Sequence, residues 1–219
     1  MLSNLSQSKI VNKLYDDVSW SFTKFNSTRD NINEFIDIAD NIVFLLKRNN
    51  IKYRDFSILG SFSQHSINVG ILNGKIGEYL MIDNIFDLVL GGILHDIGKQ
   101  YMPKSIMDKP GRLTEKERGI INTHTDIGHS VMNNIYNNDN VLNIIKNHHK
   151  IDKTFSKDVL NSNLKEEKLV FPLVCAISDI TDAMLSHRVY KKPLTIVDVK
   201  KDLLNKGFDG IDKLFDYIL

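Results

Sequence analysis

The sequence has a single cysteine and no long apolar run, and both absences exclude classes of protein. Cys175 alone can form neither an intrachain disulfide nor a zinc site built from cysteines, so we assign it to the core. The longest fully apolar stretch, residues 169–177, is far too short to span a membrane. Residues 1–17 lack the apolar segment of a secretion signal. We therefore expect a cytoplasmic protein that does not bind membranes.

The sequence also has almost no net charge. Its 28 lysines and arginines nearly cancel 27 aspartates and glutamates, which leaves a formal charge of +1. A chain with this balance has no overall positive field to attract DNA. Any anionic ligand must therefore be held by a few positive side chains placed at the binding site.

Prolines and glycines are few, and apolar residues recur with helical spacing along most of the chain. Apolar stripes cover residues 5–18 and 32–46. Further helices are predicted over 55–80, over 84–95 with Gly98 as its end, over 141–149 and over 168–186. Capping boxes at Thr114 and Thr195 open two more, and Gly207 ends the second. Residues 100–112 and 150–165 are expected to be loops. No alternating strand pattern appears, so the fold class is predicted to be all-α.

The first fifty residues are too few to form a good core by themselves. We expect residues 1–50 to be N-terminal helices that pack on a domain formed by residues 51–219, so that the chain is one structural unit. The sequence contains no internal repeat or low-complexity segment that would suggest another organisation.

Histidines and aspartates occur within stretches that are otherwise apolar. Two pairs, His95-Asp96 and His148-His149, fall at the ends of predicted apolar helices. A single histidine on an apolar face is usually an ordinary core residue, but a lone buried carboxylate is costly unless it is paired or binds a metal. The two pairs favour a metal centre. Its candidate ligands are His65, His95, Asp96, His124, His148, His149 and Asp179.

This ligand set limits the choice of metal. Imidazole and carboxylate groups without cysteine suit manganese, iron or zinc better than calcium. Seven ligands are too many for one tetrahedral zinc ion, but they suit two metal ions that share a carboxylate. We expect two divalent transition-metal ions, with iron or manganese favoured and zinc, nickel or cobalt as alternatives.

Several motifs follow one another in a recognisable order: HSINV at 65–69, GGILHDIGK at 91–99, MPKSIMDKPGRLTEKE at 102–117, HTDIG at 124–128, HH at 148–149 and DITDAMLSHRVYKKPL at 179–194. In this the chain resembles the HD phosphohydrolase superfamily and, within it, the HD-GYP phosphodiesterases of cyclic dinucleotides. The resemblance covers about residues 35–215. It implies a helical bundle with a binuclear metal site at its centre.

The resemblance also implies roles for individual residues. The seven candidate ligands fall where the family has its metal ligands, with Asp96 as the bridging carboxylate. Lys99 matches a lysine that contacts the scissile phosphate, and Arg188 and Lys191 match basic residues that hold the substrate phosphates. Asp96 and Lys99 are therefore the expected catalytic residues. The implied reaction is metal-dependent hydrolysis of a cyclic dinucleotide, with cyclic di-GMP favoured, to a linear dinucleotide or mononucleotides.

Two departures from the family pattern bear on function. The loop that contains the GYP motif is absent, because the histidine pair is followed by KIDKTFSKDV. Ser61 stands where some members have a glutamate for a third metal, so two metals are expected. Three alternatives remain open: a nucleotidase for linear nucleotides, a non-catalytic receptor for a cyclic dinucleotide, and a metal-free interaction module. A homodimer or a signalling partner also remains open.

Overall fold

The computed structural model describes residues 7–25, 29–48, 61–150, 167–186, 193–208 and 211–218, and these form helices without any strand. The predicted all-α class is confirmed. The elements are α1 (Gln7–Lys24), α2 (Arg29–Arg48), α3 (Phe62–Tyr79), α4 (Ile85–Leu94), the 3-10 helix η2 (Ile97–Tyr101), α5 (Lys104–Met107), α6 (Glu115–Asn122), α7 (His124–Ile135), α8 (Asp139–Asn147), α10 (Glu167–Leu185), α11 (Ile196–Asn205) and α12 (Ile211–Ile218).

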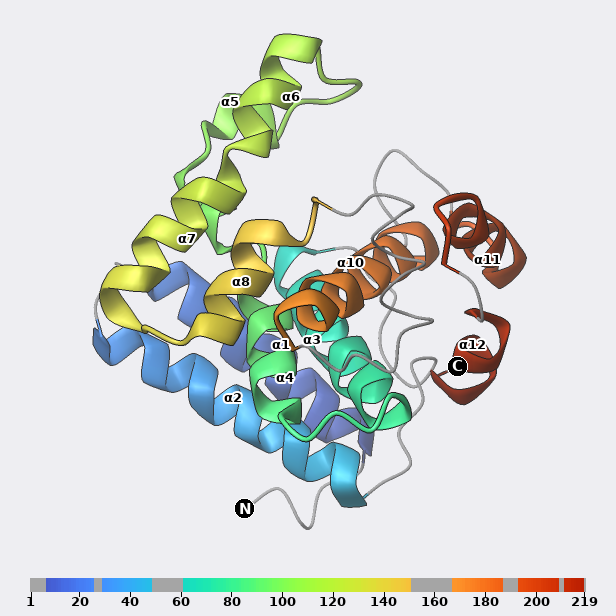
Figure 1. The fold of residues 1–219 in the computed structure, drawn as a ribbon. Helices are drawn as coiled ribbons and strands as arrows, with labels where there is room; N and C mark the ends of the chain where they lie inside the picture. Colours follow the sequence, from blue (N-terminus) through green and yellow to red (C-terminus); the bar gives the residue numbers. More distant parts are fainter. Residues whose placement is uncertain are drawn as a thin grey trace.

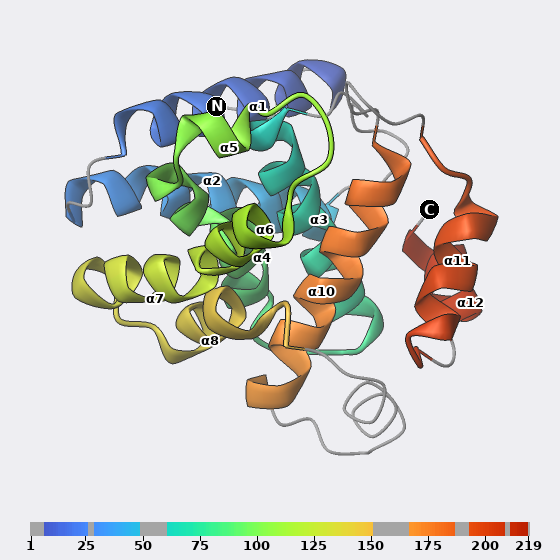
Figure 2. The ribbon, with the colours of Figure 1, turned by 90° about the horizontal axis from the view of Figure 1, so that it is seen from above.

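Helices α3 and α4 lie in the middle of the bundle (Figure 1). Helices α1 and α2 pack on one side of them, α8 packs on α4, and α10 packs against α3 and α8. Helix α7 packs on α8 and η2. The view from above shows α11 and α12 beyond α10 (Figure 2). Phe35 and Ile42 of α2 share one apolar core with Ile71 of α3 and Ile93 of α4. The two N-terminal helices therefore bury their apolar stripes against the central helices, while the division of the chain at residue 50 stays a prediction.

Helix α10 contains a proline in its interior, and a neighbouring helix compensates for it. Pro172 has no backbone N–H, so the carbonyl of Lys168 loses its usual partner within the helix. The side-chain amide of Asn143 in α8 donates a hydrogen bond to that carbonyl at 2.6 Å. This contact joins α8 to α10. Cys175 is fully buried in the same helix, as expected of a core residue.

The start of α3 differs from the sequence prediction. A helix over residues 55–80 was expected, but in the structure it begins at Phe62, and residues 55–60 lie outside the described residues. Ser61 is its N-cap, and Ser61 and Gln64 form a capping box in which each side chain accepts a hydrogen bond from the other residue's backbone N–H. The serine therefore has a local structural role, which is to cap the start of α3.

The role of Gly98 after α4 also differs from the prediction. The helix ends at Leu94 with His95 as its C-cap, and Gly98 lies within η2 rather than terminating α4. The glycine serves a close approach between backbones, because a Cβ atom at Gly98 would lie 1.9 Å from the carbonyl oxygen of His124. The predicted loop over residues 100–112 contains the end of η2 and the short helix α5.

Other local predictions are confirmed. Thr114 with Glu117 and Thr195 with Asp198 form capping boxes at the starts of α6 and α11. Gly207 follows α11 with a φ of 89°, a conformation that favours glycine at a helix end. The expected loop over 150–165 falls almost wholly outside the described residues. Among the helices that the structure describes, none combines the length and apolar character needed to cross a bilayer.

Candidate metal centre

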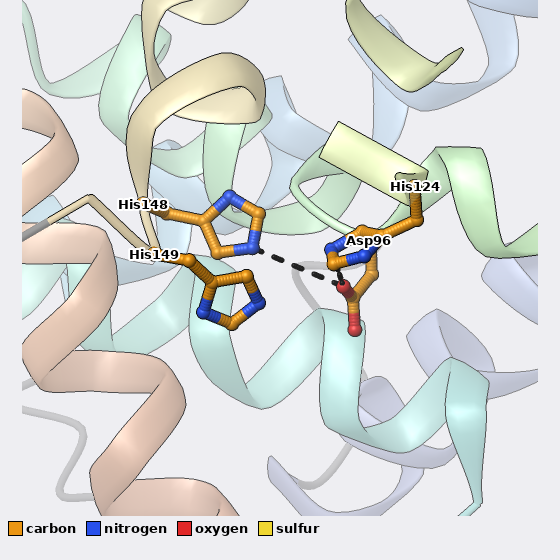
Figure 3. A group of neighbouring side chains, drawn as sticks. All are labelled: Asp96, His124, His148 and His149. Atoms are coloured by element: carbon orange, nitrogen blue, oxygen red, sulfur yellow. Dashed lines mark ion pairs between the residues drawn. The ribbon is translucent and has the colours of Figure 1, made fainter. Parts of the chain in front are cut away.

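The structure brings all seven candidate ligands together at the centre of the bundle. They form two groups, and within each group the ligand atoms all lie within 4.8 Å of one another. The first group, drawn in Figure 3, is Asp96, His124, His148 and His149, and the second is His65, His95 and Asp179. The side chains come from α3, from the ends of α4 and α8, from the start of α7 and from α10. Whether they hold metal ions stays a prediction.

Three of the histidines are oriented by the ends of helices. His95 donates from Nδ1 to the carbonyl of Gly92 at 2.7 Å, and His124 donates from Nδ1 to the carbonyl of Ile121 at 2.7 Å. These carbonyls belong to the last turns of α4 and α6, where backbone acceptors lack a partner within the helix. Nδ1 of His148 likewise contacts the carbonyls of Ile144 and Ile145 in the last turn of α8, each at 3.1 Å. Because a carbonyl only accepts, a proton resides on each Nδ1, and the neutral imidazole then has its lone pair on Nε2.

The Nε2 atoms face a space in which nothing in the described chain satisfies them. The buried atoms without a hydrogen-bond partner among the described residues include Nε2 of His95, His124 and His148 and Oδ1 of Asp96. Leaving one buried polar atom unpaired costs about 1–3 kcal/mol. Three imidazole lone pairs and a carboxylate oxygen that converge in this way are all acceptors. A bound cation would satisfy all four atoms, so the residues fit a metal site.

Asp96 stands between the two ligand groups. Its Oδ1 lies 3.0 Å from Nε2 of His124 and 3.9 Å from Nε2 of His148. Its Oδ2 lies 3.3 Å from Nε2 of His95 and 4.0 Å from Nε2 of His65. One carboxylate oxygen therefore faces each group.

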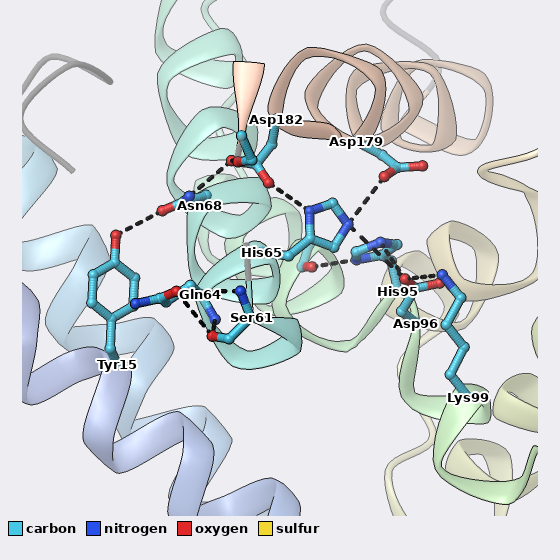
Figure 4. A network of polar contacts seen from close by, with 12 residues as sticks. Tyr15, Ser61, Gln64, His65, Asn68, His95, Asp96, Lys99, Asp179 and Asp182 are labelled. Carbon is cyan, nitrogen blue, oxygen red and sulfur yellow. Dashed lines mark hydrogen bonds and ion pairs between the residues drawn. The ribbon is translucent and has the colours of Figure 1, made fainter. Parts of the chain in front are cut away.

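A lysine adjoins the same carboxylate. Nζ of Lys99, in η2, lies 2.5 Å from Oδ2 of Asp96 (Figure 4). Burial alone would raise the pKa of Asp96, but His95 and Lys99 hold it well below its usual value. The Lys99 side chain is 23% exposed, so its charge lies at the edge of the cluster, beside solvent. Burial holds the pKa of His148 well below its usual value, which keeps this imidazole neutral, as a ligand must be.

His65 differs from the other histidines because side chains surround both of its nitrogens. Nδ1 lies 2.6 Å from Oδ2 of Asp182, and Nε2 lies 3.1 Å from Oδ1 of Asp179. Burial lowers the pKa of His65, but the two carboxylates outweigh burial and raise it to about 9. Burial raises the pKa of Asp179, but His65 holds it below its usual value. This corner of the cluster strongly attracts positive charge, whether a proton or a metal ion.

A cavity of about 290 Å³ adjoins the cluster. Its lining includes His148, His149 and Asp179 on one side and Lys206 and Phe208, which follow α11, on another. Lys206 is the one lysine or arginine among the described residues that line it. This volume lies just below the usual range for ligand pockets, about 300–1,000 Å³.

The structure adds residues that the sequence reasoning missed. Asp182, which contacts His65, lies three residues after Asp179 on the same face of α10, and this spacing was a readable signal. Asn68, Tyr15 and Lys206 carried no such signal, since tertiary contacts alone bring them to the site. The predicted phosphate-binding residues Arg188 and Lys191 lie outside the described residues.

Comparison with known proteins places the chain in a family. Residues 62–187 match the model of the HD domain, and the chain belongs to this family. The match begins with α3 and covers all seven candidate ligands.

Curated relatives are phosphodiesterases of cyclic dinucleotides. The chain is 31% identical to a cyclic di-GMP phosphodiesterase of Thermotoga maritima over 159 residues, which cover 69% of this chain and 41% of that protein. It is 28% identical over 149 residues to a cyclic di-GMP phosphodiesterase response regulator of Xanthomonas campestris, covering 67% of this chain and 38% of the relative. The chain thus spans well under half the length of these relatives.

Solved structures share the fold. Bd1817, an HDG"Y"P protein from Bdellovibrio bacteriovorus, superposes with a TM-score of 0.67 at 18% identity, covering 94% of this chain and 69% of that one. The HD domain of the phosphodiesterase PgpH from L. monocytogenes, in complex with cyclic di-AMP, has a TM-score of 0.50 at 22% identity, covering 80% of this chain and 91% of that one. With the curated relatives, these matches confirm the resemblance to HD-GYP-type proteins.

Proposed function

We propose that this chain is a metal-dependent phosphodiesterase that hydrolyses a cyclic dinucleotide. The observation that carries the proposal is the convergence of three imidazole lone pairs and a carboxylate oxygen, all buried and without a partner among the described residues, with a lysine beside them. Similarity to proteins named cyclic di-GMP phosphodiesterases supports cyclic di-GMP as the first substrate to test. Similarity to a Vibrio cholerae protein named as a 3'3'-cGAMP-specific phosphodiesterase, 29% identical over 131 residues, makes a mixed dinucleotide the second.

We assign two divalent metal ions to the centre, one for each ligand group. Asp96 is the bridging ligand in this proposal, because each of its oxygens faces a different group. The imidazole and carboxylate donors favour iron or manganese, with zinc, nickel or cobalt as alternatives. Bound there, the ions would supply positive charge that polarises a phosphodiester and activates water near neutral pH. Ser61 is committed to capping α3, which is consistent with two ions rather than three.

The chain's own residues orient the candidate ligands and bind the substrate. The carbonyls at the ends of α4, α6 and α8 hold three histidines with Nε2 directed inward. Lys99 belongs to neither ligand group, and its ammonium provides charge that would offset the charge developing on the phosphoryl oxygens. We assign Lys206, together with Arg188 and Lys191, to the binding of other parts of the dinucleotide.

The first experiment combines metal analysis with turnover. The purified chain, loaded anaerobically with Mn²⁺ or Fe²⁺, should hold about two equivalents of metal, as a carboxylate-bridged pair requires. It is then assayed with cyclic di-GMP, a mixed cyclic dinucleotide and a linear dinucleotide. Binding of a cyclic dinucleotide without cleavage would replace the enzyme with a receptor, and cleavage of the linear compound alone would replace it with a nucleotidase. Absence of bound metal would refute the metal centre.

Lys99→Ala separates catalysis from metal binding. The variant should retain the metal content of the wild type and lose about 10²–10³-fold in kcat, which is typical of removing a group that stabilises developing charge. Lys116→Ala, an exposed lysine on α6, is the matched control and should leave kcat unchanged. If Lys99→Ala is as active as the control, the role assigned to Lys99 is wrong.

A further inference from the structure

A chain of buried polar contacts connects the N-terminal helix with the candidate metal centre (Figure 4). The hydroxyl of Tyr15 in α1 donates to Oδ1 of Asn68 in α3 at 2.8 Å. Nδ2 of Asn68 donates to Oδ1 of Asp182 in α10 at 2.8 Å. Oδ2 of Asp182 accepts from Nδ1 of His65 at 2.6 Å. All four residues are buried, and Asp182 is fully so.

The direction of every donor in this chain is determined by chemistry. The carboxylate oxygen of Asp182 accepts in this contact, so the NH₂ end of the Asn68 amide must face it. The carbonyl end of that amide then faces Tyr15, whose hydroxyl must donate. At the other end, the same carboxylate holds the His65 proton on Nδ1. The hydroxyl of Tyr15 therefore favours the one amide orientation that supports Asp182.

The consequence for His65 is a defined ligand atom. Because Asp182 holds a proton on Nδ1, Nε2 is the nitrogen left for a metal ion, and it faces two other candidate ligand atoms, Oδ1 of Asp179 at 3.1 Å and Oδ2 of Asp96 at 4.0 Å. Carboxylates that accept from a metal-binding histidine raise its basicity and fix its ring, and their loss weakens metal binding by about 10–100-fold. Asn68 contacts Asp182 directly, and Tyr15 contacts Asn68, so both are connected to His65 through Asp182.

We propose that Tyr15 and Asn68 are positioning residues for the metal centre, acting through Asp182 on His65. Tyr15 lies outside residues 62–187, which match the HD domain, so α1 tunes a site to which it contributes no ligand. This inference rests on the proposed function, because it takes His65 to be a metal ligand.

The test uses the full chain and variants that change single atoms or groups. Tyr15→Phe removes the hydroxyl and keeps the buried ring. We expect metal affinity, measured by competition with a chelating dye, to fall roughly fivefold, the worth of one neutral hydrogen bond. Asp182→Asn should lose about 10–100-fold. Tyr136→Phe, at a half-buried tyrosine packed on the same core, is the control and should leave the affinity unchanged.

A second measurement excludes a purely structural effect. In the protein loaded with zinc, the ¹H and ¹⁵N shifts of the His65 Nδ1–H group report the hydrogen bond that it donates to Asp182, and loss of general stability would not change them. Tyr15→Phe should move these shifts toward those of a weaker hydrogen bond, whereas Tyr136→Phe should not. If the wild type binds metal and Tyr15→Phe equals it in both measurements, this inference is overturned and the proposed function stands. Wild-type protein that binds no metal overturns the proposed function as well.

Discussion

Replacing Asp96 by asparagine should reduce the free energy of unfolding far more when metal is bound than when it has been removed. Asparagine keeps the shape of the side chain and removes its charge. In the metal-free protein the change removes the charge-assisted contact with Lys99, 2.5 Å away. Hydrogen bonds to charged groups contribute about 1.5–3 kcal/mol, and this is the expected loss without metal.

With metal present the loss should be larger. An ion that binds only the native state adds about 4 kcal/mol when its free concentration is about a thousand times its Kd. Asp96 faces both ligand groups, so Asp96→Asn should remove most of this increment. For a chain of this size, 1 kcal/mol corresponds to about 2–4 °C in Tm. Asp96→Asn should therefore lower Tm by about 8–16 °C more with metal than in chelator for each ion that is lost.

The measurement is thermal unfolding followed by circular dichroism in Mn²⁺ and in EDTA, with Asp87→Asn as the control. Asp87 is also a buried aspartate of this core, and the amides of Asn84, Asn138 and Asn140 hold it at 2.6–3.0 Å. The same chemical change there should cost the same with and without metal. If the two variants respond alike to metal, the reasoning about Asp96 is refuted.

Three further variants probe other features. Gly98→Ala should destabilise the protein by about 3 kcal/mol and reduce metal content, because the new methyl group meets the His124 carbonyl oxygen; unchanged urea unfolding would contradict the packing argument. The Lys109 ammonium and the Thr114 backbone lower the pKa of Glu117 from 4.5 to about 2. Glu117 therefore stabilises the fold above about pH 4.5, and the Tm difference between wild type and Glu117→Gln should shrink as the pH falls from about 4.5 toward about 2; a constant difference would oppose this. Lys206→Gln should raise KM severalfold at constant kcat, and an unchanged KM would remove Lys206 from the binding site.

Local chemistry accounts for what the sequence predicted well. Apolar stripes and capping boxes act within one or two turns, so a helix containing the stripe at residues 32–46 and the caps at Thr114 and Thr195 could be inferred directly. The seven candidate ligands were found because a polar group within an apolar stretch stands out wherever its partners lie. The paired positions at 95–96 and 148–149 also located the ends of two helices close to their true positions.

Contacts between distant segments account for what was missed. Gly98 was assigned to a helix end, but its real neighbour is the backbone of His124, which periodicity cannot show. Tyr15 and Asn68 lie 53 residues apart, and each fits an ordinary helical pattern by itself. Ser61 was considered only as a poor metal ligand, although a serine three residues before a glutamine is a helix-start signal.

The use of helix-end carbonyls has a consequence for how the site can change by mutation. Any sequence that forms α4, α6 and α8 supplies the acceptors for His95, His124 and His148, because those acceptors are backbone atoms. Substitutions around these three histidines can accumulate without changing their tautomers. His65 depends instead on one side chain, Asp182, which a single substitution can remove. We expect random mutagenesis to disturb the orientation of His65 first, while the other three imidazoles keep theirs.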